Sequence, residues 1–181
     1  MEKIEKAVIE YLNDTIRTVS DFPIPGIQFK DITTLLNNPD AMKLTTDFLI
    51  RPYKGIAVDK VVGLESRGFL FGTNMAIALN AGFVPVRKPG KLPSVTNEVS
   101  YDLEYGTSTL QIHTDAIRPG DRVIIHDDLI ATGGSANAAR MLVEGLGGVV
   151  IAYSFIIELA FLNGREKLNK DIPIHSLIYL D

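Results

Sequence analysis

The sequence has no cysteine among its 181 residues. This absence excludes a disulfide framework, a cysteine-ligated zinc or iron–sulfur site, and a thiol nucleophile. A large excess of one charge is also lacking, because 18 Lys and Arg residues stand against 22 Asp and Glu residues, for a net charge of -4. The mild acidity argues against a protein that coats nucleic acid.

Long apolar runs are missing as well. No stretch approaches the roughly 18 uncharged apolar residues of a membrane-spanning helix, and residues 1–12 mix Glu and Lys with apolar residues, unlike a signal peptide. We therefore expect a cytoplasmic protein with neither a membrane nor a nucleic acid as its partner. Hydrophobic residues nonetheless make up 46% of the chain, which excludes disorder and provides for a core.

The pattern of apolar residues predicts alternating strands and helices. Helical spacing predicts an amphipathic N-terminal helix that ends before Asp21, and a second helix from about Pro39 to Ile50. Strands are expected at 56–64, 83–87, 121–126, 148–158 and 176–180, with helices at 69–79 and 136–146. This alternation predicts an α/β fold, with a mainly parallel twisted sheet flanked by helices.

Residues 88–107 break the alternation. They contain two prolines, two glycines, two tyrosines and several charges without a sustained period. A connection of this length inside a compact domain is usually a functional lid or disordered. We expect it to form a mobile hairpin or flap.

The strongest chemical signal lies where a buried strand runs into Asp127 and Asp128 and then into the turn 131–135. The glycines of this turn let backbone N–H groups converge, and the following helix N-terminus adds partial positive charge. The hydroxyls of Thr132 and Ser135 are further donors. The turn therefore predicts an anion cradle, although a turn that merely caps the helix is the alternative.

Two carboxylates beside this cradle would repel a bare phosphate. They suit a ligand that also presents hydroxyls or a bound Mg²⁺, and a sugar phosphate meets both requirements.

This run resembles the phosphoribosyl-pyrophosphate (PRPP) signature of the type I phosphoribosyltransferases. Other segments, in order along nearly the whole chain, narrow the resemblance to the branch of that family that acts on adenine. They are residues 22–32, 63–69, 87–93, 101–106, 158–159 and 164–168. The resemblance implies a Mg²⁺-dependent transfer of ribose 5-phosphate from PRPP to adenine, giving AMP and pyrophosphate. It also implies the type I phosphoribosyltransferase fold.

The resemblance further implies how the chain is organised. A single phosphoribosyltransferase domain over 1–181 is expected, with a small hood from about 22–35 and 158–181 and a flexible flap at about 88–107. Members of the family are homodimers, so a homodimer is expected here too.

Site residues follow from the resemblance by position. Asp127 and Asp128 are expected to hold the ribose hydroxyls, directly or through Mg²⁺. The residues expected to grip the 5-phosphate are Ala131, Thr132, Gly133, Gly134 and Ser135. Those expected at pyrophosphate are Glu65, Ser66, Arg67, Arg87, Lys88 and Lys91, with a cis peptide bond between Glu65 and Ser66. Those expected at adenine are Gln28, Phe29, Lys30 and Leu159.

The resemblance makes Glu104 the catalytic carboxylate and places Tyr105 in the closing flap. Several of these residues also have plainer interpretations. Without the resemblance, Arg67 is a surface arginine of an ordinary turn, the cations at 87–91 form a solvated basic turn, and Glu104 is a solvated glutamate. Phe29 and Leu159 are then ordinary core residues.

Departures from the family and rival functions complete the prediction. Lys30, His126 and Ser135 stand where the family commonly has other residues. The three histidines, His113, His126 and His175, lack metal-ligand spacing, so we interpret these histidines as structural. One rival is transfer to another base, which the Phe29 segment and Glu104 disfavour. The second is a non-catalytic PRPP sensor with a nucleic-acid target, which the short acidic chain disfavours.

Overall fold

The structure is a computed structural model that describes residues 2–102 and 106–181. The chain divides into two compact units, residues 1–48 and residues 49–181. Among the described residues, no helix is long and apolar enough to cross a membrane. The predicted hood draws its two parts from different units, so its assembly stays a prediction.

The first unit contains a two-stranded antiparallel sheet between helices. Its elements are α1 (Glu2–Thr15), β1 (Arg17–Ser20), β2 (Gln28–Asp31), α2 (Thr33–Leu36) and the start of α3 (Pro39–Ile50). The prediction of α3 is confirmed, but the prediction that the N-terminal helix continues almost to Asp21 is wrong. The helix ends at Thr15, and residues 17–20 pair with residues 28–31. Helical spacing of apolar residues cannot reveal this strand partner, which decides the conformation.

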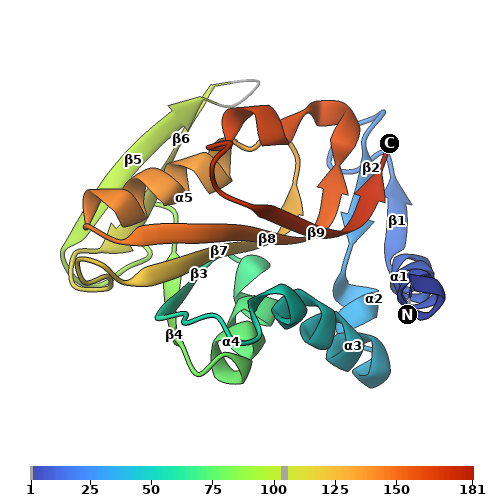
Figure 1. The fold of residues 1–181 in the computed structure, drawn as a ribbon. Helices are drawn as coiled ribbons and strands as arrows, with labels where there is room; N and C mark the ends of the chain where they lie inside the picture. The colour runs from blue at the N-terminus through green and yellow to red at the C-terminus, as the bar shows by residue number, and fades with distance from the viewer. Residues whose placement is uncertain (1, 103–105) are drawn as a thin grey trace. The chain divides into compact units, whose positions relative to one another are not determined.

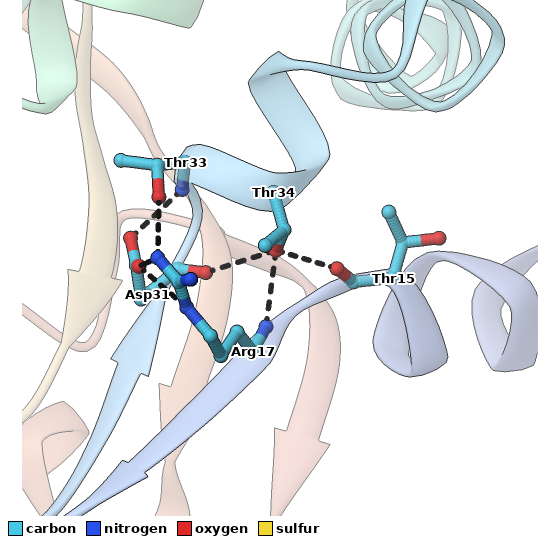
Figure 2. Close-up of polar contacts among 5 residues, drawn as sticks. All are labelled: Thr15, Arg17, Asp31, Thr33 and Thr34. Carbon is cyan, nitrogen blue, oxygen red and sulfur yellow. Dashed lines mark hydrogen bonds and ion pairs between the residues drawn. The ribbon is translucent and has the colours of Figure 1, made fainter.

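A polar network joins the two strands of the first unit to the start of α2 (Figure 2). Asp31 accepts hydrogen bonds from the guanidinium of Arg17, with Nε at 3.1 Å, and from the backbone N–H of Thr33 at 2.9 Å. The hydroxyl of Thr34 donates to the carbonyl of Thr15 at 2.6 Å and accepts from the N–H of Arg17. Hydrogen bonds from Arg17 and Thr33 lower the pKa of Asp31 to about 2. Asp31 therefore anchors the end of β2.

The second unit is built on a five-stranded sheet. Its order is β4-β3-β7-β8-β9, and every neighbouring pair is parallel. The strands are β3 (Lys60–Leu64), β4 (Gly82–Val86), β7 (Arg122–Ile130), β8 (Val149–Leu159) and β9 (Ile174–Leu180). Short 3₁₀ turns lie at Arg51–Tyr53, Ala160–Leu162 and Gly164–Lys167. The predicted parallel sheet is confirmed.

Both faces of this sheet are covered (Figure 1). Helix α4 (Gly68–Ala78) packs on β3, β4 and β7 on one face. Helix α5 (Gly134–Gly145) lies on the other, together with a hairpin of β5 (Thr96–Asp102) and β6 (Thr107–His113). The main apolar core lies on the α5 side, where Ile125, Leu142 and Phe155 are buried. The β-branched residues of β7 alternate between the two faces, as expected for a strand covered on both sides.

Three boundaries in the second unit differ from the sequence prediction. The strand expected from residue 56 begins at Lys60, and Ile56 is exposed. The strand expected to end at residue 126 continues to Ile130. The hairpin predicted within 88–107 is confirmed from Thr96, but its second strand continues to residue 113. Its mobility stays a prediction.

The network of Asp31 leads to a prediction about acid stability. Because folding lowers the pKa of Asp31, its contribution is present above the unfolded value of 3.8 and is lost as the pH falls toward about 2. We expect Asp31→Asn to lower the free energy of unfolding at pH 7 by on the order of 1 kcal/mol. The deficit should shrink between pH 5 and pH 3 in urea titrations.

Asp14→Asn is the matched control, because Asp14 is an exposed carboxylate of the same unit. A deficit for Asp31→Asn that stays constant with pH would show that the ionised carboxylate is not what stabilises the network.

Candidate active site at the carboxyl edge of the sheet

The candidate site begins at the end of β7, the middle strand of the sheet. Because β7 continues to Ile130, Asp127 and Asp128 lie within the strand and not after it. The backbone of β7 is approached closely by Gly68, the first residue of α4. A Cβ on Gly68 would lie 2.8 Å from the carbonyl oxygen of His126 and 3.0 Å from Oδ1 of Asp127. Only glycine lets α4 begin this close to the acidic pair.

The two carboxylates form an acidic pair, with Asp128 buried and Asp127 half-buried, and one arginine lies beside it. Asp128 is 2% exposed, and its Oδ2 lies 2.9 Å from Nε of Arg67. Burial raises the pKa of Asp128, and the charge of Arg67 opposes that rise. Burial also raises the pKa of Asp127 well above its usual range, and the charge of Asp128 adds to the rise. The pair therefore favours a ligand that brings hydroxyl donors or positive charge.

A cavity of about 90 Å³ lies beside the acidic pair, over the turn 131–135. This volume is several times the roughly 10–15 Å³ that a single water molecule requires. Its lining residues are Leu129, Ile130, Ala131, Thr132, Gly133, Ser135, Ala136 and Phe155. Four of the five residues predicted to bind a phosphate thus line one cavity, and the fifth, Gly134, is the first residue of α5.

The start of α5 presents groups to this cavity that are suited to an anion. Gly133 precedes the helix with φ of 78°, in the left-handed region that favours glycine. The first-turn N–H groups of a 12-residue helix carry partial positive charge, and a glycine at the N-cap has no side chain to occupy them. The cavity can therefore hold a phosphate group by its backbone alone.

A second loop reaches the same edge from β3. The peptide bond between Glu65 and Ser66 is cis, as predicted. Oε2 of Glu65 accepts hydrogen bonds from Nε of Arg87 at 3.0 Å and from the backbone N–H of Lys88 at 2.9 Å. Since β4, β3 and β7 are neighbours, their carboxyl ends bring Arg87, Glu65 and Asp128 to one edge. Lys91, another residue predicted at pyrophosphate, reaches this group through its backbone, since its carbonyl oxygen accepts a hydrogen bond from Nη1 of Arg87.

The residues predicted to bind adenine lie in both units. Gln28, Phe29 and Lys30 lie in β2 of the first unit, where Phe29 packs edge-on against the ring of Phe22 at 5.1 Å between centroids. Nζ of Lys30 donates to the hydroxyl of Thr18 at 2.8 Å. Leu159 ends β8 in the second unit. Their meeting around one base stays a prediction.

The predicted catalytic residue, Glu104, and Tyr105 lie outside the described residues. The described strands β5 and β6 do contact the candidate site, through a residue to which the sequence assigned no role. A Cβ on Gly134 would lie 3.0 Å from Cδ2 of Tyr101, so this ring packs on the start of α5. The sequence signal for this contact is weak, because it is one aromatic residue in a polar loop.

The acidic pair is also the part of the site that suits a divalent cation. Among the described residues, no three His, Cys, Asp or Glu side chains are grouped to hold a metal. Asp127 and Asp128 do offer carboxylate oxygens, the ligands that Mg²⁺ prefers. Burial raises the pKa of both carboxyls and Arg67 offsets only part of that rise, so the residues present fit a Mg²⁺ delivered together with a ligand.

His126 lies next to this pair but has a different environment. It is fully buried, its Nδ1 lies 3.0 Å from the carbonyl oxygen of Ser154, and burial lowers its pKa to about 4. The imidazole is therefore neutral at pH 7, and its structural role stays a prediction.

Comparisons with known proteins agree with this geometry. Residues 31–175 match the model of the phosphoribosyl transferase domain. An adenine phosphoribosyltransferase of Gloeobacter violaceus is 58% identical over 157 residues, which cover 87% of this chain and 92% of the relative.

Two solved structures are similar over nearly the whole chain. The crystal structure of adenine phosphoribosyltransferase from Rhodothermus marinus has a TM-score of 0.93 and 53% identity, covering 97% of this chain and 99% of its own. The enzyme from Saccharomyces cerevisiae, solved with adenine and an imino-altritol bisphosphate, has a TM-score of 0.89 and 43% identity, covering 95% and 99%. With a fold and sequence shared at this level along its length, the chain belongs to the adenine phosphoribosyltransferases.

Proposed function

We propose that the candidate site transfers the 5-phosphoribosyl group from PRPP to N9 of adenine, releasing pyrophosphate and forming AMP. The observation that carries this proposal is the acidic pair of Asp127 and the buried Asp128 at the end of β7, next to the cavity of the turn 131–135. A phosphate cradle and a hydroxyl-binding acidic pair within one strand end match the two halves of a ribose phosphate. The yeast relative was solved with adenine, which supports the choice of base.

In the proposed reaction, N9 of adenine forms a bond to the anomeric carbon of PRPP as the bond from that carbon to pyrophosphate breaks. Pyrophosphate leaves with the bonding electron pair, and Glu104 takes the proton from N9. Arg67, Arg87 and Lys88 compensate the negative charge that pyrophosphate gains. Bound Mg²⁺ would neutralise part of the same charge.

The remaining residues bind the other parts of the two substrates. Asp127 and Asp128 orient the ribose hydroxyls, and the turn 131–135 holds the 5-phosphate. Gln28, Phe29, Lys30 and Leu159 enclose adenine, and closure of the flap over 88–107 excludes water as a competing nucleophile. We propose that the enzyme acts as a homodimer in the cytoplasm and takes up Mg²⁺ with PRPP.

Turnover with a panel of bases tests the proposal directly. We expect purified protein with PRPP and Mg²⁺ to form a nucleotide from adenine in preference to hypoxanthine, guanine or xanthine, as measured by chromatography of the products. Preferential turnover of another base would contradict the assignment of the adenine residues. Binding of PRPP without turnover of any base would contradict catalysis and favour a sensor.

The role of Glu104 predicts a loss of turnover and not of binding. We expect Glu104→Gln to lower kcat by roughly 10²- to 10⁴-fold, because a proton acceptor is lost. The KM for PRPP should change little, since the 5-phosphate and ribose contacts remain. Steady-state kinetics checks both values.

Glu98→Gln is the matched control from β5, because Glu98 is exposed and, within the described residues, its side chain makes a single hydrogen bond, accepted from Gln111 at 3.0 Å. An equal loss of activity in both variants would contradict a specific role for Glu104.

The raised pKa values of Asp127 and Asp128 predict opposite pH dependences for stability and for substrate binding. A carboxyl whose native pKa is raised stabilises the fold below its unfolded pKa, and this contribution is lost as the pH rises through the native pKa. The ionised pair is the form that binds a cation or hydroxyls. We therefore expect kcat/KM for PRPP to rise with pH while the stability of the ligand-free protein falls.

Asp127→Asn leaves one carboxylate and removes the second ionisation. We expect this variant to show a flatter pH dependence of kcat/KM for PRPP and a higher melting temperature than the wild type at pH 8. A variant that keeps the wild-type pH profile in both measurements would show that the pair does not titrate together.

A further inference from the structure

The chain between β8 and β9 contacts the turn 131–135, which we call the phosphate turn, through two glycines. Gly164 is buried at the start of the short 3₁₀ turn Gly164–Lys167. A Cβ on Gly164 would overlap the carbonyl oxygen of Ala131, and a Cβ on Gly133 would overlap the carbonyl oxygen of Gly164. The two backbones therefore touch with no room for a methyl group on either side. The position of Gly164 limits where the turn 131–135 can lie.

The residue that follows Gly164 is held by a buried carboxylate. Arg165 donates to both carboxylate oxygens of Glu158, with Nη2 at 2.7 Å from Oε2. Its guanidinium also donates to the hydroxyl of Tyr179 and lies 5.3 Å from the centre of that ring. A bidentate pair with a stacked ring allows an arginine little freedom.

Glu158 is itself fixed within the sheet. It is 5% exposed near the end of β8, and the hydroxyl of Ser176 in β9 donates to its Oε2 at 2.6 Å. Burial raises the pKa of Glu158, but hydrogen bonds from Arg165 and Ser176 outweigh burial and lower the pKa overall. The carboxylate is therefore ionised at neutral pH and pairs fully with Arg165. A few residues on, Leu168 enters the apolar core and holds the other end of the segment.

We infer that Glu158 and Arg165 are positioning residues for phosphate binding, because their ion pair holds Gly164 against Ala131 and Gly133 and so sets the shape of the phosphate turn. The inference rests on the proposed function, in which this turn binds the 5-phosphate. Neither side chain lines the cavity of the turn, so neither acts on the ligand directly. Their effect reaches the ligand through the backbone contact at Gly164.

The physical basis is preorganisation. A cradle of backbone N–H groups binds a phosphate well only if the groups already converge, because ordering them on binding subtracts from the affinity. Releasing Arg165 would let the segment at Gly164 move away from the turn, and the N–H groups would lose their common direction. The contribution of the phosphate to binding should fall, whereas the contribution of the base and ribose should remain.

Adenosine and AMP differ by this phosphate. The ratio of their inhibition constants against PRPP therefore measures how much the turn 131–135 contributes to binding the phosphate. We expect Arg165→Met to reduce the preference for AMP over adenosine by roughly 10- to 100-fold. The KM for PRPP should rise by a similar factor, with a much smaller change in kcat. Arg165→Lys keeps the charge but not the bidentate pair, so its preference for AMP should lie between those of the wild type and Arg165→Met.

Lys167→Met is the matched control, because Lys167 is an exposed cation of the same 3₁₀ turn, and no ion pair is formed by its side chain within the described chain. Gly164→Ala tests the backbone contact with the ion pair intact, and it should reduce the same preference. Circular dichroism and melting temperatures identify the variants that are folded at the assay temperature.

An unchanged preference for AMP in folded Arg165→Met and Gly164→Ala overturns the inference and leaves the ion pair with a structural role alone. If Arg165→Met does not fold, the same measurement is made on Gly164→Ala and on the milder Ser176→Ala, and an unchanged preference for AMP in both overturns the inference. Wild-type protein that forms no AMP and does not prefer AMP over adenosine would contradict the proposed function instead.

Discussion

The parallel pairing of β7 between β3 and β8 is the constraint on which the candidate site depends. A parallel sheet sends the carboxyl ends of its strands to one edge, so the loop after β3 and the turn after β7 emerge side by side. Because β7 stays paired as far as Ile130, Asp127 and Asp128 are held by the sheet and not by a loop. Backbone pairing with β8 through Ile130, and with β3 as far as His126, thus supplies the rigidity that a binding site for a small charged ligand requires.

Charge compensation within the site follows from this placement. Arg67 pairs with Asp128, and Arg87 pairs with Glu65, so both arginines proposed to bind pyrophosphate already contact carboxylates. Burying an unpaired charge is costly, and these pairs reduce that cost in the ligand-free protein. A ligand that carries phosphates together with hydroxyls or a cation can pair with the arginines and with the carboxylates at once. A ligand with phosphates alone would leave the carboxylates without a partner of opposite charge or a hydrogen-bond donor.

Much of the fold was predictable because β-branched runs and glycine turns are local signals. The parallel sheet, helices near α3, α4 and α5, and the acidic motif ending in the turn 131–135 were all found from the sequence. The errors lie where a distant partner decides the conformation. Residues 17–20 leave the helical pattern because they pair with β2, and Ile56 lies exposed outside the sheet because β3 pairs only from Lys60.

Strand propensity, helix spacing and motif order lie along the chain, so the fold class, the family and the positions of the charged residues could be predicted from the sequence alone. Which charges meet depends on how the segments pack together. Arg87 contacts Glu65 and Arg165 contacts Glu158 because neighbouring segments converge at one edge of the sheet. Likewise, Gly133 and Gly164 require the absence of a side chain because two backbones touch. Contacts between residues far apart in sequence depend on packing, and no local pattern encodes them.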